Sequence, residues 1–256
     1  MSFYEWDGAS ALMNFVGLDN YKAIFQNEIF WKALSHNIFW ILFTVFIPTI
    51  FGIILAVLLN QSFVKGRLLF RVIFYMPAIV SMVAVGIVWN WILNPEFGIL
   101  NRALKFIGLD FLAFNWLGDE HTVMWALLIA GSWVHYGFCM VITMAALSGL
   151  DACYVEAAKL EGANPVQTFF YVTLPLLKNT FTLLVLNSLI GSFKVFEIVY
   201  IMTKGGPYHS SEVISTLMYR TAFMDSEFGM GSAVAVVLSV IIAVCSAVYM
   251  KYSEKE

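Results

Sequence analysis

The chain has 256 residues, of which 61% are apolar and only 12% are charged. Soluble domains carry roughly a quarter of charged residues, so this composition excludes an ordinary water-soluble protein and indicates a membrane protein. The formal net charge of −3 is too small to indicate nucleic acid or an acidic substrate as the partner.

Residues 1–36 contain neither an apolar run nor the basic region and cleavage site of a secretory signal. The orientation derived below places them outside the cell, as an extracytoplasmic segment. We therefore expect a further membrane span before Ser2 that this chain lacks, through truncation or a late start codon. The alternative is a translocated N-terminal tail.

Five apolar segments reach the roughly 20 residues that a bilayer-crossing helix needs. They cover residues 37–59, 70–93, 122–149, 179–202 and 228–250. We predict an all-α, polytopic transmembrane helical bundle, with a transmembrane domain over residues 37–250. Pro77, Gly131 and Gly137 lie inside two of the segments, where such residues often mark bends.

The connection between the first two segments carries three basic residues and no acidic one, namely Lys65, Arg67 and Arg71. Short loops enriched in Lys and Arg lie on the cytoplasmic side of a membrane. This orientation predicts that the insert 150–178 and the tail 251–256 are cytoplasmic, and that residues 94–121 lie outside with residues 1–36.

The third segment carries amphipathic rings at Trp133, His135, Tyr136 and Phe138. Sugars are bound by apolar ring faces together with a few hydrogen-bonding groups, so this cluster suits a sugar site. The alternatives are an aromatic belt at the membrane surface and, for His135, a buried histidine with satisfied hydrogen bonds.

The insert between the third and fourth segments has the pattern of two short helices. Ser148 and Asp151 have the spacing of a capping box, helix-forming residues follow over 152–161, and Gly162 suits the left-handed residue that closes a helix.

A second helix is predicted over 165–173, because Asn164 is a good N-cap, Pro165 fits the first helical position and Gln167 completes a capping box. Its apolar face holds Val166, Phe169, Phe170 and Val172. A helix lying on lipid headgroups is one interpretation of the insert, but such helices favour Lys and Arg. Acids outnumber bases in the first helix, which favours a protein partner.

The fourth segment carries two charged residues, Lys194 and Glu197, which three-residue spacing would place on one helical face. They are either an internal, satisfied pair or groups that face a water-filled substrate path. Ser188, Ser192 and Val195 form a second stripe, which indicates either close helix packing or part of the same path. After this segment, 203–207 predicts a tight turn and 208–227 a short surface helix.

Two sets of motifs carry a family resemblance. EAA at 156–158, Gly162, a branched apolar residue at Val172 and Leu174-Pro175 resemble the signature of the membrane subunits of binding-protein-dependent ABC importers. Val172 stands where Ile is commoner, and Asp151 where Pro is common. SFYEWDG, FVGLDNY, NPEFGILN, FNWLG and MTKGGPYHSS, in that order over nearly the whole chain, are similar to the maltose and multiple-sugar branch.

This resemblance implies a permease subunit in a bacterial plasma membrane. It implies as partners a second, similar permease, separate ATPase subunits, an extracytoplasmic sugar-binding protein, and a sugar or oligosaccharide as substrate. The insert would be a coupling helix in a cleft of the ATPase, through Tyr154, Glu156, Ala157, Ala158, Gly162 and Ala163. The substrate path would involve Trp133, His135, Phe138, Ser188, Ser192, Val195, Lys194 and Glu197.

The sequence contains no phosphate-binding loop, and Gly205-Gly206 leads directly into a proline. We therefore expect ATP and magnesium on a partner subunit, and neither a cofactor nor enzymatic activity in this chain. The three separated cysteines and four histidines predict no metal site. The rival interpretations are an ion-coupled secondary transporter that uses Lys194 and Glu197, an intramembrane enzyme, and a truncated, non-functional permease fragment.

Overall fold

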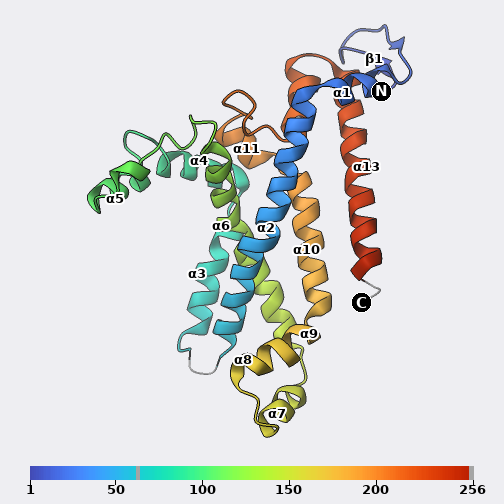
Figure 1. Ribbon diagram of the computed structural model, residues 1–256. Helices are drawn as coiled ribbons and strands as arrows, with labels where there is room; N and C mark the ends of the chain where they lie inside the picture. The colour runs from blue at the N-terminus through green and yellow to red at the C-terminus, as the bar shows by residue number, and fades with distance from the viewer. Residues whose placement is uncertain (62–63, 254–256) are drawn as a thin grey trace.

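The computed structural model describes residues 1–61 and 64–253, so the end of the predicted tail, 254–256, lies outside the described residues. The chain folds as an all-α bundle with a small N-terminal hairpin, which confirms the predicted fold class (Figure 1). The strands are β1 (Tyr4–Glu5) and β2 (Asn14–Phe15), paired antiparallel with Tyr4 opposite Phe15.

The helices follow in chain order. They are α1 (Asp19–Gln26), α2 (Glu28–Asn60), α3 (Arg67–Ile79), α4 (Met82–Ile92), α5 (Ile99–Phe106), the 3-10 turn η1 (Asp110–Leu112), α6 (Val123–Ser148), α7 (Ala152–Leu160), α8 (Pro165–Thr168), the π-helix η2 (Phe169–Thr173), α9 (Leu174–Leu176), α10 (Lys178–Phe193), α11 (Glu197–Met202), α12 (Ile214–Tyr219), the π-helix η3 (Arg220–Met224) and α13 (Phe228–Ser253).

The bundle is built around α2, which packs on α6 along much of its length and on α10 beside it (Figure 1). Two glycines allow the close approach of α2 and α6. A Cβ on Gly52 would lie 2.7 Å from Cβ of Cys139, and one on Gly131 would lie 2.8 Å from the ring of Trp40. Small residues at such crossings are the usual means of bringing membrane helices together.

Three helices, α2, α6 and α13, are long and apolar enough to cross a membrane without a break. Two further pairs qualify only as bent units. These are α3 with α4, bent by 98°, and Pro165–Leu176 with Lys178–Phe193, bent by 69°. The third and fifth predicted segments therefore correspond to single helices, whereas the first helix begins earlier than predicted, at Glu28.

The bend near Pro77 falls at Val80 and Ser81, not at the proline itself. Ser81 is the N-cap of α4, and its hydroxyl accepts a hydrogen bond from the Ala84 N–H at 3.3 Å. Gly131 and Gly137 lie within a continuous α6, so the bend expected there is absent from that helix.

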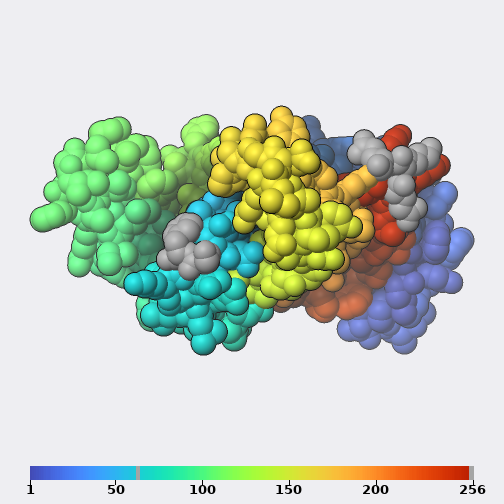
Figure 2. All heavy atoms as spheres, turned by 90° about the horizontal axis from the view of Figure 1, so that it is seen from below, coloured from blue at the N-terminus to red at the C-terminus, as the bar shows by residue number. Residues whose placement is uncertain are grey.

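The two ends of the bundle differ in structure. At one end, the α2–α3 connection lies near the insert, which is formed by α7, α8, η2 and α9 (Figure 1). Seen from this end, the insert projects over the middle of the molecule, with α3 beside it (Figure 2). At the other end, the hairpin packs on the start of α13, where the Gly229 N–H donates to the Trp6 carbonyl at 3.1 Å.

Candidate functional site

The helix α10 ends at Phe193 because side chains from other elements satisfy its last carbonyl groups. Asn37 on α2 donates from Nδ2 to the Ser192 carbonyl at 2.7 Å, and Ser215 donates from Oγ to the Phe193 carbonyl at 3.2 Å. Carbonyls at a helix end need such partners. The predicted continuous helix through 202 is therefore wrong, since α11 starts separately at Glu197.

Lys194 and Glu197 lie on either side of this break. Lys194 caps α10 and Glu197 is the first residue of α11, so the expectation that they share one helical face is wrong. Both side chains are exposed, and they form no ion pair with each other among the described residues. Val195 lies within the break and packs against the apolar cluster around Trp40 and Val199.

The two serines of the predicted stripe are buried between helices. Ser188 and Ser192 are 1% and 3% exposed. Nε2 of His135, on α6, lies 2.9 Å from the Ser188 hydroxyl, and the Thr44 hydroxyl, on α2, lies 2.9 Å from that of Ser192. These contacts join α2, α6 and α10 through hydrogen bonds at one depth of the bundle.

The other three residues of the predicted aromatic cluster are half-buried and make separate contacts, Tyr136 with Phe51 of α2 at a centroid distance of 5.2 Å. Trp133 stands edge to face with Trp89 of α4, with ring centroids 6.2 Å apart. Phe138 lies 6.3 Å from the ring of His135 and packs in the cluster around Ile53 and Leu184. Within the described part of the chain, His135 and Ser188 are the one pair of predicted path residues that are joined to each other by a side-chain hydrogen bond.

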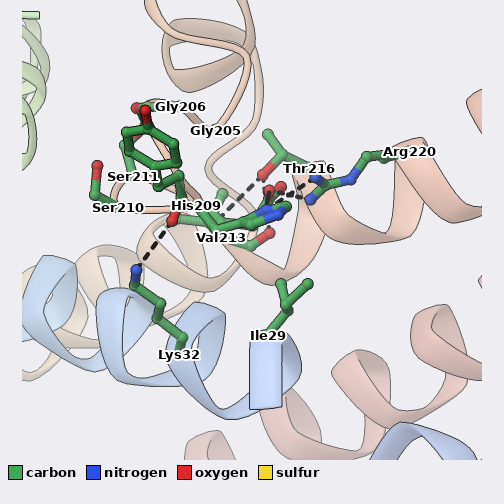
Figure 3. Close-up of polar contacts among 12 residues, drawn as sticks. Ile29, Lys32, Gly205, Gly206, His209, Ser210, Ser211, Val213, Thr216 and Arg220 are labelled. Atoms are coloured by element: carbon green, nitrogen blue, oxygen red, sulfur yellow. Dashed lines mark hydrogen bonds and ion pairs between the residues drawn. The ribbon is translucent and has the colours of Figure 1, made fainter. Parts of the chain in front are cut away.

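Residues 210–217 are buried, so the predicted surface helix over 208–227 is wrong in its environment. Glu212, whose side chain is 1% exposed, accepts a hydrogen bond from Arg220 and lies 2.9 Å from Nδ1 of His209 (Figure 3). Gly205 adopts φ +85°, and a Cβ there would lie 2.7 Å from the Glu212 carboxylate. The loop closes over this carboxylate, and a side chain at position 205 would collide with it. This explains why residue 205 is a glycine.

The same loop is tied to α2. Nζ of Lys32 donates to the Tyr208 carbonyl at 3.1 Å (Figure 3), and Nδ1 of His36 lies 2.7 Å from the Glu212 carbonyl. Sequence reasoning missed Glu212 and Arg220. The turn sequence at 203–207 predicts the position of the loop. No local pattern in the sequence indicates that Glu212 is buried or that it pairs with Arg220, eight residues further along the chain.

The insert forms the predicted pair of short helices with one change at its start. Asp151, not Ser148, caps α7, accepting from the Cys153 N–H at 3.0 Å, while the Ser148 hydroxyl donates back to Met144. Gly162 closes the helix at φ +82°, as predicted.

The second helix begins at the predicted residue and then changes from an α-helix to a π-helix. Asn164 and Gln167 form both hydrogen bonds of a capping box, each at 2.9 Å. The helix starts at Pro165, becomes π-helical over Phe169–Thr173 and continues through Pro175 to Leu176. It therefore extends beyond its predicted end at residue 173 and passes through Pro175.

The first helix of the insert lies on the surface over its full length, with no buried residue. Tyr154, Glu156, Ala157 and Gly162 are exposed, and Leu160 is 89% exposed. The half-buried members of the predicted coupling set are Ala158 and Ala163. Ala163 also lines a cavity of about 480 Å³ between the insert and the end of α2.

Two groups at the start of α7 have shifted acidities. Hydrogen bonds from Cys153, chiefly from its backbone N–H, hold the pKa of the Asp151 carboxyl below its ordinary value. Desolvation, followed by the hydrogen bond and charge of Asp151, raises the pKa of the Cys153 thiol. In the described part of the chain, no three His, Cys, Asp or Glu side chains come together as metal ligands.

The sequence matches the family described as "Binding-protein-dependent transport system inner membrane component" over residues 24–255. A Bacillus subtilis (strain 168) relative, the probable ABC transporter permease protein YurN, is 35% identical over 98% of this chain and 87% of its own length. The probable starch degradation products transport system permease protein AmyD of Thermoanaerobacterium thermosulfurigenes is 30% identical over 99% of this chain and 85% of its own.

A solved structure shares the fold. It is a bacterial alginate ABC transporter in complex with an alginate pentasaccharide-bound periplasmic protein, and one of its chains superposes with a TM-score of 0.86 at 25% identity. The similarity covers 93% of this chain and 83% of that one.

Proposed function

Because the chain belongs to the binding-protein-dependent transport system inner membrane components and is a permease subunit of an ABC importer, we propose that it forms half of a sugar path driven by separate ATPase subunits through the insert. The other half of the path would come from a second, similar permease. The complex would sit in a bacterial plasma membrane with the insert on the cytoplasmic side.

The exposure of α7 is the observation that carries the coupling proposal. A helix that only joined two spans would bury part of its surface on the bundle, whereas α7 presents Tyr154, Ala157 and Leu160 to its surroundings. Exposed apolar groups rimmed by charges such as Glu156 are typical of a protein-binding surface. In this proposal, Glu156, Ala157, Ala158 and Gly162 contact the ATPase, with Tyr154 and Ala163 at the edges.

The connection from the insert to the membrane helices suits the transmission of movement. η2 packs on α7 and runs through α9 directly into α10, with a bend of 69° before Lys178. A displacement of α7 therefore acts on the base of α10. Rigid helices that pivot about a packed interface are a common means of alternating access.

The exposed break after α10 is the part of the chain that we assign to the sugar path. Lys194 and Glu197 would face the path, with Val195 behind them. Ser188, Ser192 and His135 would hold α10 against α2 and α6, with Trp133 and Phe138 in the wall on α6. ATP and magnesium would bind only to the ATPase subunits, so this chain would catalyse no reaction.

A sugar substrate is supported by what the relatives are named for. AmyD is named for starch degradation products, and the similar solved structure carries a pentasaccharide-bound periplasmic protein. We extend both features to this chain as a proposal, with an extracytoplasmic sugar-binding protein as the delivering partner. Ion-coupled transport through Lys194 and Glu197 is not favoured, since the family is that of ABC importers.

The native cysteine of α7 provides a direct test of coupling. Cys153 is exposed on the insert, so a short thiol-reactive crosslinker attached there should capture the ATPase subunit in an active, reconstituted complex. A Cys153→Ser variant should lose the product, and Phe106→Cys in that background, 92% exposed at the far end of the molecule, should not restore it. Capture of lipid alone from Cys153 would contradict the proposal.

A further inference from the structure

The helix α5 carries large apolar side chains on its outer face. Ile99 and Phe106, which seven-residue spacing places on one face of the helix, are 68% and 92% exposed. The opposite face holds the buried Asn101 and the half-buried Leu100 and Leu104. A surface helix in water normally has its polar residues outside, so the outer face of α5 is suited to a partly apolar environment.

Side-chain hydrogen bonds fix the direction of this face. Nδ2 of Asn101 donates to the Phe114 carbonyl at 2.9 Å, and Nε1 of Trp116 donates to Oδ1 of Asn101 at 2.8 Å. Leu100 and Trp116 pack against the apolar cluster that contains Val123, the first residue of α6. Because the inner face of α5 is held in this way, the outer face cannot turn toward the bundle.

The helix also projects sideways from the bundle. Figure 1 shows α5 to one side of the bundle near the level of α4, and Figure 2 shows the same stretch as a green lobe at one edge of the molecule. Its contact with the cluster at the start of α6 places α5 level with one end of a helix that is long and apolar enough to cross a membrane. An arm at this level meets the boundary between acyl chains and lipid headgroups.

Basic side chains border the apolar face. Arg102 and Lys105 are exposed, helical spacing places them on the same side of that face, and α5 contains no acidic residue. Neither forms an ion pair with another described residue. Apolar side chains flanked by Lys and Arg are typical of helices that lie among lipid headgroups. Lysine is depleted at protein–protein interfaces, so the charges favour lipid over the second permease as the partner of this face.

We propose that α5 lies in the extracytoplasmic headgroup layer and binds anionic phospholipid there. Ile99 and Phe106 contact the upper acyl chains, and Arg102 and Lys105 contact phosphate oxygens. The inference goes beyond sugar import, and it rests on the proposed orientation only for the choice of leaflet. Since α4 packs on α11, the lipid contact supports the segment that follows the break after α10.

Fluorescence quenching in the reconstituted importer, with its partner permease and ATPase, tests this contact. Bimane is attached at Phe106→Cys in a Cys153→Ser/Cys245→Ala background, in vesicles of equal parts phosphatidylcholine and phosphatidylglycerol. We expect strong quenching by lipid that carries a nitroxide near its headgroup, and little quenching by iodide in the water. Ile99→Cys should give the same result because it lies on the same face.

The matched control for the label is Tyr208→Cys in the same background. Tyr208 is 86% exposed in the loop between α11 and α12, so bimane there should be quenched by iodide and not by the labelled lipid. Iodide quenching at Phe106→Cys as strong as at Tyr208→Cys would place α5 in water and overturn the proposal. Protection of both α5 labels from both quenchers would place the helix against the partner permease and overturn it as well.

The preference for anionic lipid is tested by Lys105→Gln. Lipid quenching should be stronger with phosphatidylglycerol present than in phosphatidylcholine alone, and Lys105→Gln should lower this preference by about fivefold, the effect of one basic residue at an anionic surface. Lys22→Gln, which removes an exposed lysine from α1, should not change it. Equal quenching in the two kinds of vesicle would overturn the proposal.

The quenching measurement requires no transport, which separates this inference from the proposed function. A complex that imports no sugar and still shows lipid quenching at Phe106→Cys would overturn the proposed function and leave the lipid contact standing. A complex that imports sugar without such quenching would do the reverse.

Discussion

Glu212 is the buried charge around which the loop between α11 and α12 is organised. Removing a carboxylate from water is costly unless a cation and hydrogen bonds compensate for it. Arg220 supplies the cation and a hydrogen bond, and Nδ1 of His209 lies 2.9 Å from both the carboxylate and the guanidinium. The Gly205 backbone lies directly against the carboxylate. The pair therefore fixes the position of the loop more than it adds to net stability, since burying an ion pair gains little over apolar packing.

Removing one member of this pair should be strongly destabilising. Glu212→Gln leaves the Arg220 guanidinium, whose side chain is 27% exposed, without its counter-charge, and we expect the free energy of unfolding to fall by about 2 kcal/mol. Thermal unfolding of the purified complex, followed by tryptophan fluorescence, measures the change as a lower Tm.

An exposed ion pair provides the matched control for this variant. Lys22 and Asp19 form a pair 2.9 Å apart in which both side chains are 70% exposed. Lys22→Ala should change the free energy of unfolding by less than about 1 kcal/mol. A Glu212→Gln protein as stable as Lys22→Ala would show that Glu212 is not held as an ionised partner of Arg220.

At this scale, the sequence predicts local partners better than distant ones. The Asn164–Gln167 capping box and the left-handed Gly162 follow from spacing alone, because every atom involved belongs to neighbouring residues. The burial of Glu212 depends on Arg220 and on α2, which only the tertiary fold brings together. The spacing of residues along the sequence does not indicate a contact between Glu212 and these distant partners.

Among the helices, the apolar segments were predictable and their interruptions were not. Hydropathy indicates that a segment is apolar, but it does not indicate whether the segment forms one continuous helix. The end of α10 depends on Asn37 and Ser215, which come from other elements. The break before α4 carried a local signal, since Ser81 is a good N-cap within an otherwise apolar run.

Gly162 sets the angle between the two helices of the insert, so its replacement should impair coupling. Gly162→Ala places a Cβ on a residue at φ +82°, where a side chain is strained even though no atom lies within 4 Å. We expect sugar-stimulated ATP hydrolysis by the complex to fall severalfold, while the complex still assembles and retains its basal hydrolysis.

Gly108→Ala is the matched control, because Gly108 has φ +79° and is equally free of neighbours but lies at the other end of the molecule. Its replacement introduces similar backbone strain and should leave stimulated hydrolysis unchanged. Equal losses of stimulated hydrolysis in both variants would show that backbone strain in general causes the effect. Unchanged stimulated hydrolysis in Gly162→Ala would show that the angle between the two insert helices is not needed for coupling.

The proposed orientation of the whole molecule rests on three basic residues in one short connection, and the fold places the end of α2, the start of α3 and the insert at the same end (Figure 1). The predicted architecture, with its family resemblance, was therefore obtained from apolar length, loop charge and motif order. The arrangement of helices around α2 required contacts such as that of Gly52 with α6, which no pattern within one segment specifies.

Two positions at opposite ends of the molecule provide a test of this orientation in the permease pair without its ATPase. A membrane-impermeant maleimide should label native Cys153 in inside-out vesicles only, whereas Tyr208→Cys in a Cys153→Ser background should be labelled in intact cells, since Tyr208 is 86% exposed. Labelling at mildly alkaline pH is needed, because the raised pKa of Cys153 lowers its reactive thiolate fraction at neutral pH. The opposite labelling pattern would reverse the assigned orientation.

The bend between α3 and α4 has a consequence for the surrounding lipid. With 13 residues, α3 rises only about 20 Å, which is well short of the roughly 30 Å of a bilayer's hydrocarbon core. Neighbouring α2 and α6 are far longer. One flank of the molecule is therefore thinner than the membrane that holds it, and acyl chains there must compress or a companion helix must fill the shortfall. A change in bilayer thickness should therefore act on this permease subunit at the flank formed by α3.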